Sequence, residues 1–372
     1  MRHSPQNNQC LQRLLLSERS PDIASGPDVP NTRQGSIKDV ARLAGVSIAT
    51  VSRCMNYPEK VSEKTRLKVQ QAVVATGYSP NTLAQSFRRG KTNIVMVVLP
   101  SVGDPFFSAV MRGIRIAASA QGYSVIFEDT QFNEMTDDEL GTVLVSNQVD
   151  GLILLASISP FGNEILSAKT KANLPVVIGC ETVSPELSGF PSVHIDNVSA
   201  AREATKYLIS QGHERIAMIC GQASSLLTKD REDGYRIAMK ESRLSIKDGW
   251  VINGDLSISG ARKATRSLMS HATRPTAIFC ANDEMAIGCI HEIKSNGLRV
   301  PQDISVLGFD DIRYAEVTDP PLTTISQPAE EIGERAMYRL CRSLVTGHDD
   351  NAEAEIVPHK LVVRQSVARQ SS

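Results

Sequence analysis

Apolar residues recur along this chain with two different periods. In the stretch "IKDVARLA", Ile37, Val40, Ala41 and Ala44 fall at i, i+3, i+4 and i+7, so they share one face of a helix. From residue 93 onward, short apolar runs such as "NIVMVVLP" and "DGLILLAS" alternate with amphipathic stretches such as "AAREATKYLISQGH". The first pattern predicts a small helical unit. The second is typical of parallel strands that helices cover on both faces.

The helical unit reads as two short helices separated by Gly45, whose backbone freedom suits a tight turn. Ser47 is a good N-cap for a second helix that begins at Ile48. In that helix Val51 and Met55 share a face that packs on the first helix. The side chains on the other face are Ile48, Ala49, Ser52 and Arg53. This arrangement predicts a helix-turn-helix, in which the start of the second helix enters the major groove of DNA.

A third helix is predicted from its N-cap at Ser62 to a stop at Gly77. In the segment that follows, Leu83, Ala84 and Phe87 lie on one helical face, and Arg88 and Arg89 follow directly. So short a helix is marginal by itself. The segment is therefore either a basic linker or an apolar wedge flanked by phosphate-binding cations.

Beyond residue 93 the apolar runs form two series. Four strands are predicted within residues 93–180. After "SVHID" come four more, in "RIAMICG", "WVINGD", "AIFCAND" and "ISVLGFDD". Two such series predict two similar lobes. Ligands of open α/β sheets bind beyond the carboxyl ends of the strands, so we expect a binding site in the cleft between the lobes.

Charge separates the two regions further. Residues 36–92 hold ten Lys/Arg and three Asp/Glu, a net charge of +7, whereas residues 93–372 hold 26 and 35, a net charge of −9. A basic head on an acidic body indicates that only the head meets a polyanion, although a merely solvated charged surface gives the same count.

The seven cysteines are scattered and never form a C-x-x-C pair. This usage is typical of buried thiols in a reducing cytoplasm, and it argues against a disulfide framework or a zinc site. The sequence contains no H-x-x-x-H spacing and no G-x-S-x-G, P-loop or G-x-G-x-x-G motif. We therefore expect no catalytic activity, no metal and no cofactor.

The apolar runs are far shorter than the about 20 residues that a membrane-spanning helix needs. The stretch "CLQRLLLSERS" has no cleavage site of small residues. These features predict a cytoplasmic protein without membrane contact. Residues 1–35 are rich in Pro, Ser, Asn and Asp and predict a disordered tail. A start codon assigned too far upstream would look the same.

Several motifs carry a family resemblance: "IKDVARLAGVSIATVSR", "VSEKTRLKV" and "GYSPNTLAQSF" in the head, and "DPFF", "VHIDN", "RPTAIFCANDEMAIG" and "DPPLTTISQP" in the body. Over residues 36–367 the chain resembles the lactose-repressor (LacI) family, and within it the cytidine-repressor branch. The resemblance implies an α/β fold: a three-helix helix-turn-helix head plus hinge helix, then a two-lobe periplasmic-binding-protein-like body with two parallel sheets. The implied divisions are the tail 1–35, the DNA-binding domain 36–80, the hinge helix or linker 81–92, and the effector-binding and dimerisation body 93–372.

The resemblance also implies DNA contacts. Ile48, Ala49 and Arg53 match base-reading positions, and Arg53 is suited to a bidentate contact with guanine. The expected phosphate contacts are Thr50, Ser52, Asn56 and Ser62. The expected hinge contacts in the minor groove are Asn81, Ala84, Phe87 and Arg88. Phe87 departs from the family's leucine, but phenylalanine is also an accepted wedge between base steps.

Residues at strand ends supply the candidate effector contacts: Phe106, Phe107, Asp129, Glu181, Arg231, Asn282 and Asp310. By resemblance, Arg231 and Asp310 lie on facing loops, where they donate to and accept from ligand hydroxyls. We expect either residue to be replaceable without loss of folding. For each residue the alternative is a structural salt bridge or cap. Leu256 and the stretch Ser224–Leu227 depart from the purine-repressor pattern, which disfavours a purine base and leaves sugar and nucleoside open.

Together these features predict a ligand-controlled transcription repressor that binds a pseudo-palindromic operator as a homodimer. The end of the chain, "LVVRQSVARQSS", shows no leucine heptad, so a tetramerisation helix is not expected. One alternative is a periplasmic solute-binding protein, which requires a signal peptide and no DNA-binding head. Another is an α/β enzyme, which lacks a nucleophile or metal constellation here.

Overall fold

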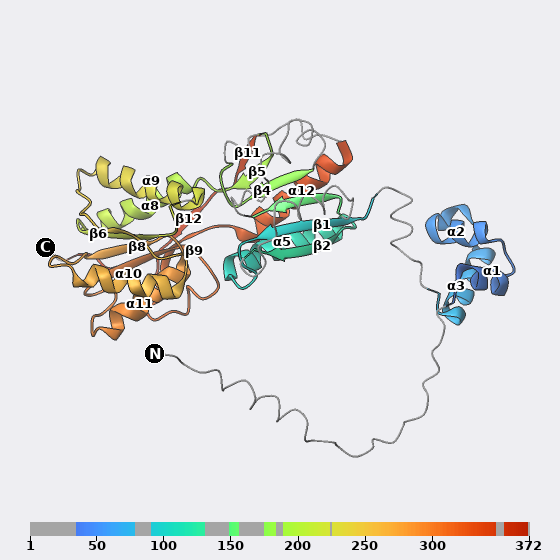
Figure 1. Ribbon diagram of the computed structural model, residues 1–372, viewed down its shortest axis with the longest axis horizontal. Coiled ribbons are helices and arrows are strands. Elements are labelled where there is room, and N and C mark those ends of the chain that lie inside the picture. Colours follow the sequence, from blue (N-terminus) through green and yellow to red (C-terminus); the bar gives the residue numbers. More distant parts are fainter. Residues whose placement is uncertain are drawn as a thin grey trace, which may run out of the picture. The chain divides into compact units, whose positions relative to one another are not determined.

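The computed structural model describes residues 35–78, 91–130, 149–155, 175–183, 189–223, 225–346 and 353–370. The chain divides into two units, residues 1–82 and 83–372 (Figure 1). We call the described part of the first unit, residues 35–78, the head. The expected tail up to residue 34, most of the expected hinge segment, and Ser224 lie outside the described residues. No helix among the described residues is long and apolar enough to cross a membrane.

The head consists of three α-helices and one short 3₁₀ turn: α1 (Ile37–Ala44), α2 (Ile48–Asn56), η1 (Pro58–Lys60) and α3 (Glu63–Thr76). Its core consists of Val40, Ala41, Ala44, Val51, Cys54, Val69 and Ala72. Gly45 ends α1 with φ 65° and Gly77 ends α3 with φ 60°, the left-handed conformations that glycine adopts most easily. The predicted helices and their stops are therefore present.

Side chains at the helix starts fix the ends of the head helices. Ser47 Oγ accepts a hydrogen bond from the Thr50 backbone N–H at 3.1 Å, as expected of the N-cap of α2. Ser36 and Asp39 form a reciprocal capping box at the start of α1. Ser62 holds the N-cap position of α3 but makes no side-chain bond to the backbone there. The starts of α2 and α3 therefore differ in how their N–H groups are satisfied.

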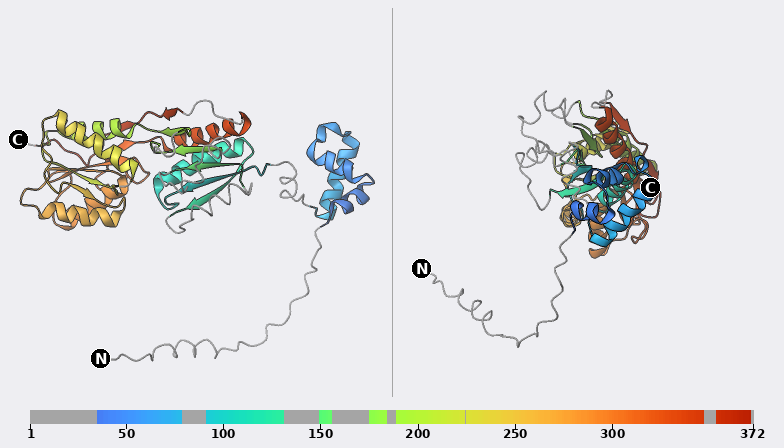
Figure 2. Two further views of the ribbon diagram at one scale, coloured as in Figure 1. Left: turned by 45° about the horizontal axis from the view of Figure 1, so that its top comes forward. Right: turned by 90° about the vertical axis from the view of Figure 1, so that its right-hand side faces the viewer.

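The second unit contains two six-stranded sheets (Figures 1 and 2). We call the parts built on them lobe 1 and lobe 2. The sheet of lobe 1 has the order β11-β5-β4-β3-β1-β2, and all its pairs are parallel. Its strands are β1 (Ile94–Leu99), β2 (Ser124–Asp129), β3 (Gly151–Leu154), β4 (Val176–Gly179), β5 (Ser192–His194) and β11 (Ala354–Ile356).

Two helices of lobe 1, α5 (Pro105–Ala120) and α12 (Ala329–Thr346), pack closely together. Two glycines make this contact possible. A Cβ at Gly113 would lie 2.0 Å from the Glu330 carbonyl oxygen, and one at Gly333 would lie 2.2 Å from that of Val110. Because no side chain fits at either position, the start of α12 is held directly against α5.

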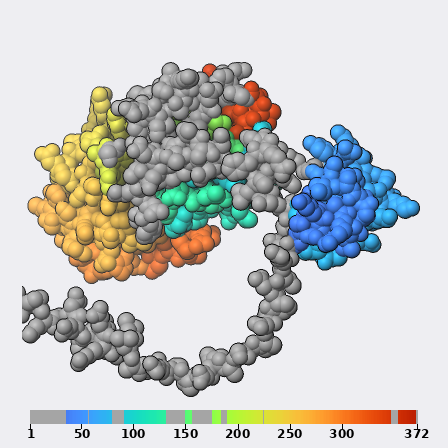
Figure 3. All heavy atoms as spheres, turned by 45° about the vertical axis from the view of Figure 1, so that its right-hand side comes forward, coloured from blue at the N-terminus to red at the C-terminus, as the bar shows by residue number. Residues whose placement is uncertain are grey.

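The sheet of lobe 2 has the order β12-β10-β9-β8-β6-β7. Its strands are β6 (Ile216–Cys220), β7 (Val251–Asn253), β8 (Ala277–Cys280), β9 (Ser305–Asp310), β10 (Thr323–Ser326) and β12 (Lys360–Val362). The covering helices are α8 (Asn197–Ser210), α9 (Leu226–Glu241), α10 (Ile258–Ser270) and α11 (Asp283–Ser295). In Figure 1, α8 and α9 lie on one face of the sheet and α10 and α11 on the other. In Figure 3 the yellow and orange atoms belong to this lobe.

The two predicted series of strands are confirmed, but the sheets are not built from two consecutive halves of the chain. β11 joins the lobe 1 sheet after lobe 2 has begun, and β12 then returns to lobe 2. The chain therefore passes between the lobes three times: after β5, after β10 and after β11. The lobe 2 sheet is also not purely parallel, because β12 pairs antiparallel with β10. The short strands β10, β11 and β12 carry little apolar signal, which explains why the sequence pattern did not indicate them.

Candidate functional site

The outer face of α2 presents the side chains that the sequence assigned to base reading. Ile48 is 44% exposed although it is apolar, and Ala49 and Arg53 are exposed beside it. On the opposite face Val51 and Cys54 are buried against the other helices of the head. Since α2 already has an apolar face in the core, Ile48 is not needed for packing. An exposed apolar residue beside an arginine suits contact with base edges and thymine methyl groups.

Two of the four expected phosphate contacts, Thr50 and Ser62, lie at helix starts in the head. Thr50 is half-buried in the first turn of α2, where its Oγ1 lies 2.9 Å from Ser47 Oγ. Ser62 is exposed at the start of α3, and its Oγ lies 3.0 Å from Thr65 Oγ1. Backbone N–H groups at such positions attract phosphates. Ser52 lies in the middle of α2, half-buried.

The remaining predicted DNA contacts have no described side chain. Asn56 is the last residue of α2, and its side chain lies outside the described part of the structure. Asn81, Ala84, Phe87 and Arg88 are likewise outside the described residues.

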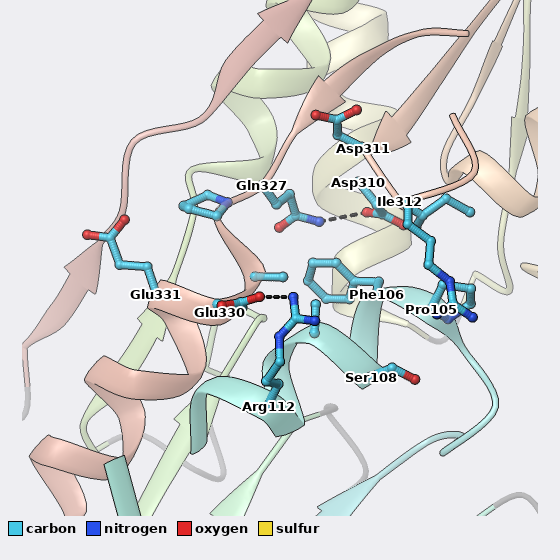
Figure 4. Close-up of a pocket in the computed structure, with 14 residues that line it drawn as sticks. Pro105, Phe106, Ser108, Arg112, Asp310, Asp311, Ile312, Gln327, Glu330 and Glu331 are labelled. Carbon is cyan, nitrogen blue, oxygen red and sulfur yellow. Dashed lines mark hydrogen bonds and ion pairs between the residues drawn. The ribbon is translucent and has the colours of Figure 1, made fainter. Parts of the chain in front are cut away.

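In the second unit, a cavity of about 500 Å³ opens where the start of α5, the end of β9 and the start of α12 meet (Figure 4). Of the predicted effector contacts it brings together Phe106 and Asp310. The cavity is also lined by Gln327, which lies on the second passage of the chain between the lobes. Sequence reasoning missed Gln327 because it did not detect β10, the strand that ends just before it.

The structure corrects the predicted placement of Arg231 and Asp310. Arg231 is not on a loop but in the second turn of α9, because Ser225 caps that helix by accepting from the Thr228 N–H. Asp310 is the last residue of β9. Both belong to lobe 2, and their charged groups pair with each other, Arg231 Nη2 to Asp310 Oδ1, at 3.5 Å.

Arg231 is only 2% exposed and is surrounded by protein acceptors. Its Nε donates to Asn197 Oδ1 at 3.0 Å, and its Nη1 donates to the Ala281 carbonyl oxygen. The guanidinium plane lies over the Phe309 ring, with 3.7 Å between the guanidinium carbon and the ring centroid. A buried cation needs such pairing, because removing it from water is costly.

Asp310 has an unusual backbone conformation and a raised pKa. Its φ of 108° lies in the region that disfavours any side chain, and such strain clusters at binding sites. Gln327 Nε2 donates to Asp310 Oδ1 at 2.7 Å. Burial raises the pKa of Asp310 to about 7, more than the nearby Arg231 lowers it. The carboxyl group therefore titrates near neutral pH.

Phe106 and Phe107 are placed by the cap of α5. Asp104 Oδ1 accepts from the Phe106 backbone N–H at 2.7 Å, which fixes the first turn of the helix at the cleft. Phe106 is buried and Phe107 half-buried, and the rings meet edge to face with centroids 5.4 Å apart. Burial also raises the pKa of Asp104.

The other predicted effector contacts take part in local structure. Asp129 ends β2 and accepts from the Val102 N–H at 2.8 Å. Asn282 caps α11 through the Met285 N–H at 2.8 Å, and its Nδ2 donates to the Leu256 carbonyl at 3.1 Å. Glu181 is buried after β4, near enough to Arg231 to influence its pKa. These contacts fit the alternative interpretation of caps and structural pairs, and a role in binding stays a prediction for all three.

The two lobes also touch beside the cleft. Thr182 Oγ1, after β4 in lobe 1, donates to Asp230 Oδ2 on α9 of lobe 2 at 2.9 Å. No group of three or more His, Cys, Asp or Glu residues among those described is arranged to hold a metal ion. The six described cysteines are buried free thiols.

Comparison with known proteins identifies the class of protein. Residues 36–81 match the family of bacterial regulatory proteins of the lacI type, and residues 92–365 match the family of periplasmic binding proteins and sugar-binding domains of the LacI family. The chain belongs to the LacI family of bacterial regulatory proteins. It therefore combines a helix-turn-helix head with a two-lobe ligand-binding body, as the sequence predicted.

Among its relatives, the HTH-type transcriptional repressor CytR of Escherichia coli K12 is 37% identical over 331 residues, covering 89% of this chain and 96% of the relative. The ribose operon repressor of the same organism is 37% identical and covers 81% and 91%. A solved structure of the lac repressor dimer bound to operator and an anti-inducer superposes with a TM-score of 0.79 at 28% identity, covering 90% of this chain and all of that one. These relatives are repressors, neither enzymes nor plain solute-binding proteins.

Proposed function

We propose that this LacI-family protein is a homodimeric transcription repressor that reads a pseudo-palindromic operator with α2. Its operator affinity is controlled by a sugar or nucleoside bound between the lobes. The exposed face of α2, with Ile48, Ala49 and Arg53 turned away from a complete core, is the observation that carries the DNA-binding part. Solved relatives support the rest: one is a lac repressor dimer on operator, and another is a regulator in complex with cellobiose.

The division of labour follows the head and body. We assign DNA binding to residues 36–80, a hinge to residues 81–92, and effector binding and dimerisation to residues 93–372. Arg53 reads a guanine, and Ile48 and Ala49 contact thymine methyl groups. Thr50, Ser52, Asn56 and Ser62 hold phosphates, while Asn81, Ala84, Phe87 and Arg88 contact the operator centre. Since its target is DNA, we place the protein in the cytoplasm.

In the body, the effector sits where strand ends and the α5 start converge. Asp310 and Phe106 line the cavity directly. Arg231 acts through its pairing with Asp310, since its nitrogens are engaged with protein acceptors. Further effector contacts are proposed at Phe107, Asp129, Glu181 and Asn282.

The test is a selection of operators from a random palindromic DNA library by the full chain, followed by affinity measurements on the selected site. We expect one symmetric site, bound as a dimer, and release or strengthening of binding by one compound from a panel of sugars and nucleosides. Selection of no common sequence would reject DNA reading. A selected operator whose binding no compound in the panel changes would reject the assigned effector class and leave DNA reading intact.

A further inference from the structure

Another cavity lies in lobe 2, at the amino ends of its strands. It has a volume of about 620 Å³, a size that suits a small molecule. Its walls come from the residues just before β6, β8 and β9, together with the end of α10 and the turn that follows it. These three strands are parallel, and Asp310 of the effector cleft is the last residue of β9. The cavity therefore lies at the opposite ends of the strands from the effector cleft.

Part of the lining of this cavity is apolar. Met269, Pro275 and Ile304 are buried, and Leu298 is half-buried. Covering such a surface is favourable for a molecule that has a hydrophobic part of its own. The apolar lining thus favours an organic molecule over a small hydrated ion.

The charged groups of the lining are mainly cationic. Arg215 and Arg274 are exposed, and His271 is half-buried. The carboxylate in the described lining is Asp303, which accepts from Arg299 Nη2 at 2.9 Å and from Arg299 Nε at 3.0 Å. These bonds lower the pKa of Asp303 to about 2, so its charge is present and already paired. Asp303 therefore does not neutralise the two arginines.

Each of the two arginines is held by one nitrogen and presents the others. Arg215 Nε donates to the Arg274 carbonyl oxygen at 3.2 Å, and Arg274 Nε donates to the Met269 carbonyl oxygen at 3.0 Å. Among the described residues, neither guanidinium has an ion-pair partner, and the Nη1 and Nη2 groups of both have no acceptor. Glu214 is exposed and does not line the cavity. Two like charges in one cavity repel, and an anion bound to both relieves that repulsion.

We propose that this cavity binds an organic anion, a molecule with an aromatic or aliphatic body and a carboxylate or phosphate group. The anionic group accepts hydrogen bonds from the Nη groups of Arg215 and Arg274. The body covers Met269, Leu298 and Ile304. Because the cavity is separate from the effector cleft, this inference does not depend on the proposed effector control.

The test is calorimetry on the full chain with phenyl phosphate and benzoate, which carry both features. Benzyl alcohol keeps the aromatic body without the charge, and inorganic phosphate keeps the charge without the body. We expect phenyl phosphate or benzoate to bind about tenfold or more tightly than benzyl alcohol and inorganic phosphate, because only an organic anion uses both parts of the cavity. The tighter of the two organic anions identifies the preferred anionic group.

Variants then locate the binding. Arg215→Gln removes one guanidinium, and we expect it to weaken binding of the tighter anion about tenfold and to leave benzyl alcohol unaffected. Arg236→Gln, which removes an equal charge from an exposed arginine of α9, is the matched control and should leave binding intact. Arg274→Gln should act like Arg215→Gln. Thermal unfolding checks that all three variants are folded, since Arg274 also bonds to the last turn of α10.

Failure of both phenyl phosphate and benzoate to bind at about 10 mM would overturn the inference. Equally tight binding of benzyl alcohol or of inorganic phosphate would overturn it too, as would an unchanged affinity in both cavity variants. Asp310→Asn tests the location independently. If that variant alters the affinity for the anion, the compound is bound in the effector cleft and the assignment to this cavity is wrong.

Discussion

The DNA-reading face of α2 and the effector cleft contrast in how their functional side chains are held. On α2, Ile48 and Arg53 are exposed, and the core of the head is complete without them. In the cleft, Arg231 and Asp310 are buried and bonded to each other and to the protein. We therefore expect substitutions on the outer face of α2 to change DNA binding without changing the free energy of unfolding, and substitutions in the cleft to change both effector binding and the free energy of unfolding. Measuring binding and unfolding for the same variants tests this contrast.

Arg231→Ala should show the largest effect. It leaves Asn197 and the Asp310 carboxylate in the cleft without their partner, and loss of one member of a buried ion pair costs about 3–5 kcal/mol of unfolding free energy. This revises the expectation from sequence that folding would survive. Urea unfolding of the full chain measures the loss. Arg202→Ala, which removes an exposed arginine paired with Glu241, is the control and should cost far less. A loss equal to that of the control would contradict the coupling.

Asp310 should make the stability of the body depend on pH near neutrality. Its pKa in the folded state is raised to about 7 from 3.8, so the folded protein holds this proton more tightly than the unfolded chain does. The stabilisation is complete below about pH 4 and is lost as pH rises through 7. Relative to Asp310→Asn, which does not titrate, the parent should lose unfolding free energy between pH 5 and about 8. A difference that stays constant over this range would show that Asp310 is already ionised at pH 5.

Arg53→Ala should affect DNA recognition and not stability, in contrast to the loss of stability expected for Arg231→Ala. We expect it to reduce discrimination at one base pair of each operator half-site by about 1–3 kcal/mol, with no change in unfolding temperature. Arg53→Lys keeps the charge but not the bidentate fork, so it should restore overall affinity better than specificity. Binding to a panel of single-base operator variants supplies the measurement. An identical specificity profile for parent and alanine variant would remove Arg53 from the base-reading set.

The smallest effect should come from the helix caps of the head. Ser47→Ala removes a side-chain bond to the Thr50 N–H and should cost about 1 kcal/mol of unfolding free energy. Ser62→Ala should cost less, because Ser62 makes no such bond at the start of α3. Thermal unfolding followed at the head compares the two. Equal costs would mean that the cap geometry does not decide the stability of these helices.

Local sequence patterns were enough to predict the helices of the head and the central strands of both sheets. The spacing of Val40, Ala44 and Val51 specified a buried face, and the glycines at 45 and 77 marked the helix ends, because each of these signals acts over a few residues. Near-continuous apolar runs marked β1, β3, β6, β8 and β9 for the same reason. The directions of Ile48 and Arg53 followed from helix geometry alone.

The arrangement of the cleft could not be predicted in the same way, because it depends on contacts between residues far apart in the chain. Arg231 was expected on a loop because it follows a predicted strand and matches an effector contact of the family, yet the Ser225 cap places it in α9. Gln327 was missed, since its role arises only when the end of β10 lies beside the end of β9. Likewise nothing in the residues around 354 indicates that they pair with β5, more than 150 positions earlier in the chain.

The three passages between the lobes have a consequence for synthesis. Lobe 1 starts first, but one edge of its sheet is β11 (Ala354–Ile356), and one edge of the lobe 2 sheet is β12 (Lys360–Val362). During translation the lobe 1 sheet lacks an edge strand until residue 356 has been made, and the lobe 2 sheet lacks one until residue 362, so the two sheets are completed almost together, however early lobe 1 began. A product that terminates before residue 354 lacks an edge strand of both sheets. A truncation upstream of β11 therefore leaves neither lobe with a complete sheet.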